Sequence, residues 1–467
     1  MKRIAIIGGG ISGLSAAFAL EKYRRNSVAL EYGLFESSPQ LGGVLRTDHI
    51  EGCLVEAGPD SFLTEKPWAA DLCREIGLGD QLIGSNDRQR KTYILVKGRL
   101  VPIPDGLMFM VPTRILPVLW SPLFSTRTKF RMMREWFHPP KKSAADESVA
   151  SFVERHYGTE MVDRLTDPLL SGVYGGQSSQ LSLRAVLPRF AEMEARHGSL
   201  GRALLAARRK APKPAAAKPL FTSLKNGMQQ MVESVISRLT PSALHLNTPV
   251  QAIQQQNSGW MVSAGYASDH FDAVIVATSA PAVARLGLPS ELSSILGGIE
   301  YTSSVTVALA YDLSVRQSLP PGFGFLVPRS QGKRLLAATF VHNKFPHRAP
   351  EDRALIRCFL GGARDPSILE VSDEEILRIV REELWQVLSL TAEPLFTRVY
   401  KWKDAMAQYN VGHLERIQSI ERACQQLPGL ALAGNAYHGI GVPDCVRSGM
   451  DAANRALAAI GLITGDL

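Results

Sequence analysis

Three glycines near the N-terminus have the spacing of a loop that holds a dinucleotide. Gly8, Gly10 and Gly13 follow a short apolar strand at 4–7, and an Ala/Leu-rich helix is expected from Leu14. In this pattern the first glycine permits a tight turn, the second lets a pyrophosphate approach the backbone, and the third lets the helix pack closely. The N–H groups at the start of the helix then face the phosphates. The spacing therefore predicts dinucleotide binding.

A second predicted strand, residues 30–35, ends at Glu36. This acid stands at about the distance from the glycine turn at which a carboxylate binds a ribose hydroxyl. Gly42 and Gly43 follow soon after and could form an ordinary surface turn. We favour a second close approach of the backbone to the same ligand, with Arg46 reaching the charged part of that ligand.

The C-terminal part repeats the order of strand, glycine loop and helix. A strand at 430–433 ends at Gly434, a glycine-rich loop follows, and an Ala-rich helix is expected at 450–459. Such a loop and helix start form a pocket of backbone donors. Tyr437 and His438 could be catalytic, but packing beside a bound ring is favoured because catalytic histidines usually need an orienting partner. Catalytic residues are therefore left unassigned.

Length and composition set the broad class of the protein. The chain has 467 residues, enough for two or three domains, and its apolar content of 45% is ordinary for a globular enzyme. The net charge of +8 indicates a carboxylate-bearing substrate, an acidic lipid surface, or simply a solvated basic surface. No nucleic-acid motif accompanies the charge, so nucleic acid is not an expected partner.

The cysteines and the apolar runs indicate the cellular location. Five cysteines are scattered without CxxC spacing, which argues against a disulfide framework and against a zinc site, so no metal is expected. The first residues lead directly into a strand, which leaves no room for a signal peptide. No apolar run approaches the roughly 18–20 residues of a membrane span. The expected location is the cytoplasm, with peripheral attachment to the inner face of the cell membrane as an option.

Residues 105–137 are the candidate segment for attachment to the membrane. It is apolar and broken by prolines, and its second half alternates apolar side chains with the cations Arg127, Lys129, Arg131 and Arg134. This pattern is typical of a surface that lies on anionic lipid. Core helices with one solvated basic face would give the same pattern, and the sequence leaves both interpretations open.

These elements predict an α/β fold with a Rossmann-type, doubly wound dinucleotide-binding domain, a mixed-sheet substrate domain and an inserted helical domain. The dinucleotide-binding domain is predicted to be discontinuous, over 1–85, 220–290 and 425–467. Residues 86–210 are predicted to form the helical domain, which contains the lipid-binding candidate. Residues 291–424 are predicted to form the substrate-binding sheet domain.

The doubled glycine pattern resembles the flavoprotein family of amine oxidases, phytoene desaturases and protoporphyrinogen oxidases, whose dinucleotide is FAD. The match becomes more specific at further segments, which resemble motifs of protoporphyrinogen and coproporphyrinogen oxidases in order along nearly the whole chain. They are residues 56–62, 96–104, 167–176 with 181–184, 224–229 and 434–445. Each motif alone is weak evidence for this resemblance, but the whole series in order is strong evidence.

The resemblance implies which residues hold FAD. They come from the glycine turns, the Gly-Pro motif, the strand after Pro249 and the C-terminal loop: Gly8, Gly9, Gly10, Ile11, Ser12, Gly13, Glu36, Gly42, Gly43, Val44, Arg46, Gly58, Pro59, Asp60, Ser61, Val250, Gly434, Ile440, Gly441 and Val442. In the family, the C-terminal loop places its N–H groups against the flavin, where a helix dipole stabilises negative charge.

Substrate contacts are implied at other positions. Val173 and Tyr174 are candidates to face one side of a flat tetrapyrrole. Asp60 stands where the mitochondrial type carries an arginine, which removes an anchor for a substrate propionate. Lys66 and Lys91 are the nearest cations that could replace it.

The implied reaction is the oxidation of a porphyrinogen to its porphyrin in haem biosynthesis, with removal of six hydrogens. FAD would accept them two at a time, and dioxygen would take the electrons and give hydrogen peroxide. A tetracarboxylate would use more replacement cations than a dicarboxylate, so coproporphyrinogen is favoured over protoporphyrinogen. Other enzymes of haem synthesis could be partners.

Two other functions remain open. The chain could be another flavoenzyme of the superfamily, an amine oxidase or a carotenoid desaturase. Asn435, where amine oxidases commonly carry an acid, counts mildly against the first of these. It could also be a flavin- and porphyrin-binding protein without catalysis, which would leave the series of motifs unexplained.

Overall fold

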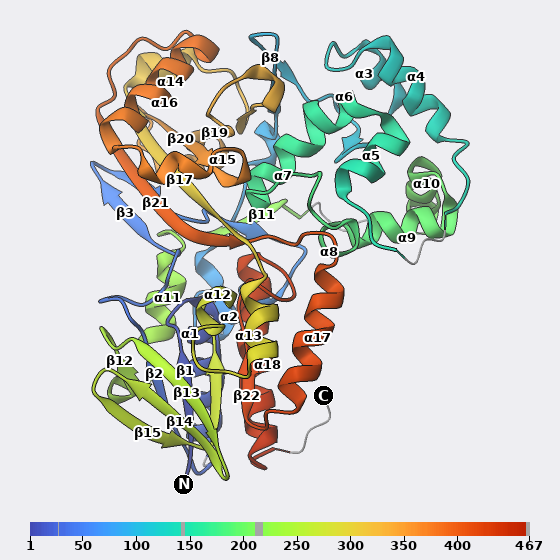
Figure 1. Ribbon diagram of the computed structural model, residues 1–467. Helices are drawn as coiled ribbons and strands as arrows, with labels where there is room; N and C mark the ends of the chain where they lie inside the picture. The colour runs from blue at the N-terminus through green and yellow to red at the C-terminus, as the bar shows by residue number, and fades with distance from the viewer. Residues whose placement is uncertain (27, 142–144, 211–217, 464–467) are drawn as a thin grey trace. The chain divides into compact units, whose positions relative to one another are not determined.

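Figure 1 shows a computed structural model of the chain, which describes residues 1–26, 28–141, 145–210 and 218–463. The chain forms two compact units, each assembled from separate stretches of sequence. The first unit consists of Met1–Ser85, Pro219–Tyr301 and Glu415–Leu467, and the second of Asn86–Lys218 and Thr302–Leu414.

A five-stranded sheet forms the centre of the first unit. Every neighbouring pair of its strands is parallel, and its spatial order departs from sequence order, as in a doubly wound sheet. Apolar runs explain its burial, since Ile4, Ile6 and Ile275 are fully buried. In spatial order the strands are β12 (Leu244–His245), β2 (Leu30–Phe35), β1 (Lys2–Ile7), β16 (Ala273–Val276) and β22 (Leu430–Leu432).

Two helices of the first unit pack unusually closely because glycine allows it. These are α1 (Ile11–Arg25) and α18 (Val442–Ala459). A Cβ atom on Gly449 would lie 2.0 Å from the carbonyl oxygen of Ser12, so a side chain there would force the helices apart. This contact holds the middle of α18 against the start of α1.

Smaller sheets and helices complete the first unit. The sheets are β3 (Thr47–Ile50) with β4 (Cys53–Glu56), β11 (Phe221–Leu224) between β5 (Phe62–Leu63) and β6 (Leu82–Gly84), and β14 (Gly259–Ala264) between β13 (Val250–Gln256) and β15 (Ala267–Phe271). The other helices are α2 (Trp68–Glu75), α11 (Gln229–Ile236), α12 (Ala280–Val283), α13 (Ser290–Gly297) and most of α17 (His413–Gln425).

A seven-stranded mixed sheet forms one part of the second unit. Its order is β21 (Phe396–Ala407), β17 (Tyr301–Tyr311), β20 (Ala354–Gly361), β19 (Ala337–Phe340), β18 (Gly324–Leu326), β7 (Thr92–Val96) and β8 (Arg99–Pro102). The pair β18–β7 is parallel and β7–β8 antiparallel, so the predicted mixed sheet is confirmed. The helices α14 (Leu313–Ser318), α15 (Val341–Lys344) and α16 (Asp373–Leu388) accompany it. The hydroxyl of Ser372 accepts the N–H of Glu375 and caps α16.

Helices make up the rest of the second unit. They are α3 (Ile115–Trp120), α4 (Thr126–Glu135), α5 (Val149–Tyr157), α6 (Thr159–Met161), α7 (Asp167–Tyr174), α8 (Leu183–Val186), α9 (Pro188–His197) and α10 (Leu200–Lys210), with a short hairpin of β9 (Leu107–Met108) and β10 (Val111–Pro112). None of the helices in the described part of the chain combines the length and hydropathy needed to span a bilayer.

The helices and the mixed sheet form one unit rather than two. The sequence analysis places 86–210 and 291–424 in separate domains, but strands β7 and β8 of the first segment extend the sheet of the second. Ile94 on β7 also packs into the core of the helices. Strand pairing between distant segments leaves no local signal in the sequence, which is why the predicted boundary differs.

Candidate cofactor site

The N-terminal glycine turn has the geometry of a phosphate-binding loop. Gly8 adopts a φ of +105°, a region that favours glycine, and its N–H donates to the carbonyl of Phe35. A Cβ on Gly13 would lie 1.8 Å from the carbonyl oxygen of Gly8, so this glycine is needed for the helix to pack on the strand. The turn thus links the ends of β1 and β2 to the start of α1.

Gly10 differs from its neighbours because its side-chain position faces open space. A Cβ there would meet no atom of the described chain within 4 Å, and its φ of −69° is accessible to any residue. Gly10 is also the N-cap of α1, and no described side chain caps that helix. The first N–H groups of α1 are therefore available to an anionic ligand.

The second glycine pair lies directly against this turn. The N–H of Gly42 donates to the carbonyl of Gly9 at 2.8 Å, and Gly42 forms a bridge with Gly10. A Cβ on Gly43 would lie 3.3 Å from the Cα of Gly10. The fold therefore brings together the two glycine segments that the sequence analysis assigned to one ligand.

Glu36 closes the turn from the end of β2. Its Oε2 accepts the N–H of Gly9 at 2.7 Å, and its Oε1 accepts the N–H of Ser38 at 2.8 Å. Each carboxylate oxygen accepts more than one hydrogen bond, so Glu36 can also receive a ribose hydroxyl. Arg46 is exposed, with its Nε 3.3 Å from Asp48, and its guanidinium has further donors.

A buried hydroxyl adds a feature that the sequence analysis missed. Thr278 follows β16, and its methyl carbon lies 2.9 Å from the position of a Cβ on Gly8. Its Oγ1 is buried and finds no hydrogen-bond partner among the residues that the structure describes. Buried hydroxyls are normally satisfied, so this atom fits a cradle completed by a polar ligand. The sequence signal that could have identified Thr278 was its position after a buried strand of the same sheet.

The start of α18 supplies a second set of backbone donors. Gly441 is its N-cap, and within the described residues this helix also has no side-chain cap. Gly439 in the preceding loop has a φ of +126°, and a Cβ there would collide with Asp444. The N–H of Gly434 donates to the hydroxyl of Ser448 at 3.1 Å, which fixes the end of β22 against α18. The starts of α1 and α18 thus each present backbone donors and a positive dipole end, and we expect both to face one ligand.

The other predicted FAD residues lie in the same unit. Ile11, Ser12 and Val442 are buried, and Val44, Gly58, Pro59, Ser61, Val250 and Ile440 are partly buried. A Cβ on Gly58 would lie 2.1 Å from the carbonyl oxygen of Val44, which requires glycine there. The backbone carbonyl of Asp60 accepts the hydroxyl of Ser223 at 2.7 Å. Their contacts to FAD stay a prediction.

Lys66 has a partner that the sequence did not indicate. Its Nζ lies 2.6 Å from Oδ2 of Asp444, a buried carboxylate in the first turn of α18. Arg447 is farther from the same carboxylate, at 3.9 Å. Lys91, the other predicted propionate anchor, is an exposed residue of the second unit. Both assignments stay predictions, and the geometry gives Lys66 a structural role as well.

Val173 and Tyr174 end α7 in the second unit. Val173 is 59% exposed, and the carbonyl of Tyr174 accepts the side-chain N–H of Gln408 at 2.7 Å. Gly175 then adopts a left-handed conformation that ends the helix. An exposed apolar side chain at a helix end suits a binding wall, and this role stays a prediction.

His438 of the C-terminal loop has a carboxylate partner that the sequence did not indicate. Nε2 of His438 lies 2.9 Å from Glu421, and both side chains are half exposed. Burial raises the pKa of Tyr301 to about 12, and its hydroxyl donates to Asn435 and accepts from the N–H of Ala280. Burial also raises the pKa of Tyr437 well above its usual value. Both phenols stay protonated at neutral pH, and neither serves as a base.

Comparisons with known proteins agree with this geometry. Residues 11–457 match the family described as flavin containing amine oxidoreductase. A coproporphyrinogen III oxidase from Bacillus subtilis is 35% identical over 98% of both chains. Protoporphyrinogen oxidase 2, chloroplastic/mitochondrial, from Arabidopsis thaliana is 27% identical over all of this chain and 96% of its own. A crystal structure from Exiguobacterium sp. 255-15, assigned as a protoporphyrinogen oxidase, superposes with a TM-score of 0.87 at 30% identity, over 97% of this chain and 98% of its own.

The motif series and these matches agree along the full length, so the resemblance found in the sequence is confirmed. The two uncapped helix starts, the open position at Gly10 and the unsatisfied hydroxyl of Thr278 fit a bound dinucleotide. The chain therefore belongs to the flavin containing amine oxidoreductases, within the branch that contains the porphyrinogen oxidases, and its cofactor is FAD.

Proposed function

We propose that this protein oxidises coproporphyrinogen III to coproporphyrin, with dioxygen as the electron acceptor. The observation that carries the proposal is the full-length match to a relative of that name at 35% identity, together with a cradle suited to FAD. The two proteins named for protoporphyrinogen oxidase, from Arabidopsis thaliana and Exiguobacterium, are 27% and 30% identical, both below 35%, which favours the tetracarboxylate substrate.

The chemistry balances without any further reductant or oxidant. A porphyrinogen loses six hydrogens when it becomes the aromatic porphyrin, and three molecules of dioxygen take them up as three of hydrogen peroxide. FAD supplies the two-electron chemistry, while the protein supplies position and electrostatics.

The chain's own contribution to this reaction is electrostatic. The N–H groups and positive dipole ends of α1 and α18 stabilise negative charge in the cradle. The ion pair between Lys66 and Asp444 holds the start of α18 in place. The phenols of Tyr301 and Tyr437 stay protonated at neutral pH, so they can donate hydrogen bonds but do not act as bases.

Turnover of the two porphyrinogens tests the proposal. We expect kcat/KM, followed by porphyrin fluorescence, to favour coproporphyrinogen by about ten- to hundredfold, because a charge-assisted contact contributes roughly 1.5–3 kcal/mol. About three peroxides should form per porphyrin, and excluding dioxygen should stop the reaction. A preference for protoporphyrinogen would contradict the substrate assignment. FAD binding without peroxide would indicate a carrier, and turnover of a polyamine or phytoene would indicate another branch of the family.

We also propose that the exposed face of α4 docks on anionic lipid. Arg127, Phe130 and Arg134 follow one another at intervals of three and four residues, which places them on one side of α4, and Phe137 comes two residues after the helix ends. All are exposed, while Met132 on another side is buried. The sequence allowed either core helices or a lipid-binding surface in this segment. The exposed face combines cations with solvent-exposed rings, which favours the lipid-binding surface.

Neighbouring side chains enlarge this apolar surface. Trp120 at the end of α3 is 86% exposed and Phe137 is 81% exposed, and Leu116 and Trp136 are exposed as well. Large exposed rings mixed with cations are typical of segments that insert into the headgroup region of a bilayer.

Vesicle binding tests the docking face. We expect the protein to co-sediment with phosphatidylserine vesicles at low salt, and to be released by salt because each cation contributes about 1 kcal/mol. Replacing Trp120 and Phe137 by serine should abolish sedimentation. Trp385→Ser is the matched control, since Trp385 is exposed on α16 of the same unit and should not matter. Failure of the unaltered protein to sediment would contradict the proposal.

A further inference from the structure

The helical part of the second unit contains a cluster of charged and imidazole groups that the proposed reaction does not use. His138 follows α4, His156 lies on α5, and Glu194 lies on α9. One ligand atom from each of these three residues lies within 4.8 Å of the others. His156 and Glu194 are buried, and His138 is partly buried. We propose that these three residues bind a zinc-type divalent cation.

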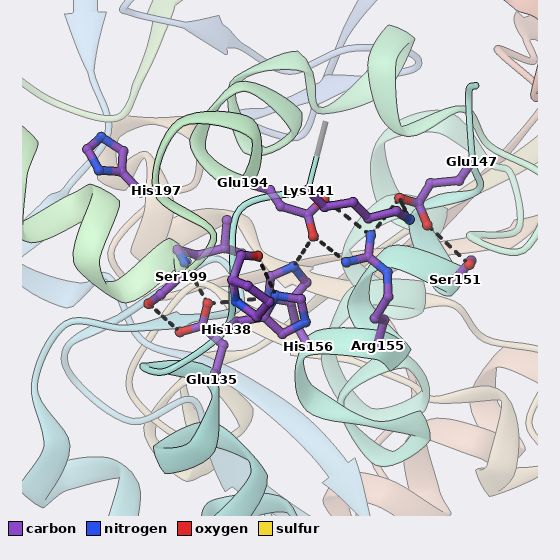
Figure 2. Close-up of polar contacts among 12 residues, drawn as sticks. Glu135, His138, Lys141, Glu147, Ser151, Arg155, His156, Glu194, His197 and Ser199 are labelled. Carbon is purple, nitrogen blue, oxygen red and sulfur yellow. Dashed lines mark hydrogen bonds and ion pairs between the residues drawn. The ribbon is translucent and has the colours of Figure 1, made fainter. Parts of the chain in front are cut away.

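The distances suit first-row metal coordination. Nε2 of His156 lies 3.1 Å from Oε1 of Glu194. Two ligands at about 2.0–2.1 Å from a tetrahedral zinc ion are separated by about 3.3 Å. The rings of His138 and His156 are stacked on each other, with centroids 4.4 Å apart (Figure 2). Because the ligand atoms of the three residues lie within 4.8 Å of one another, a rotation of the His138 ring out of this stack would bring together two nitrogens and one oxygen.

The carboxylate of Glu135 is placed to orient the ring of His156. Nδ1 of His156 lies 3.3 Å from Oε1 of Glu135, so one ring nitrogen is fixed while the other faces Glu194. Glu135 is itself held by the N–H of Leu200 at 2.5 Å and by the hydroxyl of Ser199 at 3.0 Å. Histidines that bind metals commonly donate their other N–H to such a carboxylate.

The charged groups around the three ligands are nearly balanced. The carboxylates are Glu135, Glu147 and Glu194, and the cations are Arg155, Lys141 and Arg202, whose Nη2 donates to the backbone carbonyl of His138 at 2.8 Å. Arg155 donates to both carboxylate oxygens of Glu194 and to Oε1 of Glu147 at 2.6 Å, which orients Glu194. On binding a divalent ion, Oε1 of Glu194 would exchange its contact with Arg155 for the metal.

The ligand set predicts which metals bind. Two imidazoles and a carboxylate suit Zn²⁺ and Co²⁺, whereas Mg²⁺ and Ca²⁺ prefer oxygen ligands. Three protein ligands leave a fourth position for water. Because the ligands come from the segment after α4, from α5 and from α9, the bound ion would hold these three parts of the unit together.

Calorimetry and the visible spectrum of Co²⁺ test the site in tag-free, FAD-loaded protein after chelator treatment. We expect one equivalent of Zn²⁺ to bind with a Kd of about 1 μM or below. Co²⁺ should give the strong visible bands of a four-coordinate site, and millimolar Mg²⁺ should not displace it. No stoichiometric binding, or the weak spectrum of a hydrated ion, would overturn the proposal.

Substitutions test whether the Zn²⁺ ion binds at these residues. His138→Gln and Glu194→Gln should each weaken Zn²⁺ binding at least tenfold, and Glu135→Gln should weaken it by about 10- to 100-fold. His197→Gln is the matched control, because His197 is an exposed residue of the same helix as Glu194 and should leave affinity unchanged. If Glu194→Gln fails to fold, the partly buried His138 decides the question. Unchanged affinity in His138→Gln, or loss of binding in His197→Gln, would show that the metal binds elsewhere.

Discussion

Gly10→Val is expected to give a folded protein that no longer retains FAD. The substituted Cβ would meet no protein atom within 4 Å among the described residues, so the chain itself tolerates it. The valine side chain would instead enter the space in front of the uncapped start of α1, where the pyrophosphate is predicted to approach. We expect FAD binding to weaken by about 100- to 1000-fold, as overpacking and loss of phosphate contacts together imply.

Flavin released on denaturation, measured per chain, and circular dichroism together check this expectation. Gly172→Val is the matched control, since Gly172 in α7 also faces open space but lies in the other unit. It should keep its FAD. Gly13→Val should behave differently from both, because its Cβ would collide with the backbone of Gly8 and impair folding itself. Full flavin occupancy in Gly10→Val would show that the cofactor is misplaced.

Lys66→Ala is expected to weaken the first unit rather than merely alter substrate choice. The substitution leaves the buried carboxylate of Asp444 with Arg447, at 3.9 Å, as its remaining cationic partner among the described residues. Removing a hydrogen-bonded charge from a buried partner costs about 1.5–3 kcal/mol, and the lower part of that range suits a lysine that is 36% exposed. The temperature of thermal unfolding and the affinity for FAD should both fall, because Asp444 supports the start of α18.

The double variant Lys66→Ala with Asp444→Asn separates the two roles of Lys66. If Lys66 acts through Asp444, neutralising the carboxylate should recover much of the lost stability, and the two substitutions should be non-additive. If Lys66 anchors a propionate, the ratio of kcat/KM for the two porphyrinogens should change while FAD affinity stays constant. Lys91→Ala, an exposed residue of the second unit, should leave stability unchanged. A drop in stability in Lys91→Ala would contradict this interpretation.

Local patterns were enough to predict the cofactor and the main elements of the first unit. The strand at 30–35 follows from its apolar run, and the glycine turn follows from the spacing of its glycines. Each of these signals acts within a few residues, because φ preferences and side-chain periods are local properties. The helix at the C-terminus was predicted from 450 but begins at Val442, since Pro443 suits the first turn of a helix.

The sequence by itself therefore determined the dinucleotide turn, the family and the mixed α/β architecture. Only the tertiary structure decided which distant side chains meet. Lys66 pairs with Asp444 across 378 positions of sequence, and Thr278 comes to lie beside Gly8. His156 meets Glu194 because separate helices pack around a shared apolar core, whereas the cysteine spacing had predicted no metal. Such contacts depend on how helices and strands pack, and packing brings together residues whose spacing along the chain follows no fixed period.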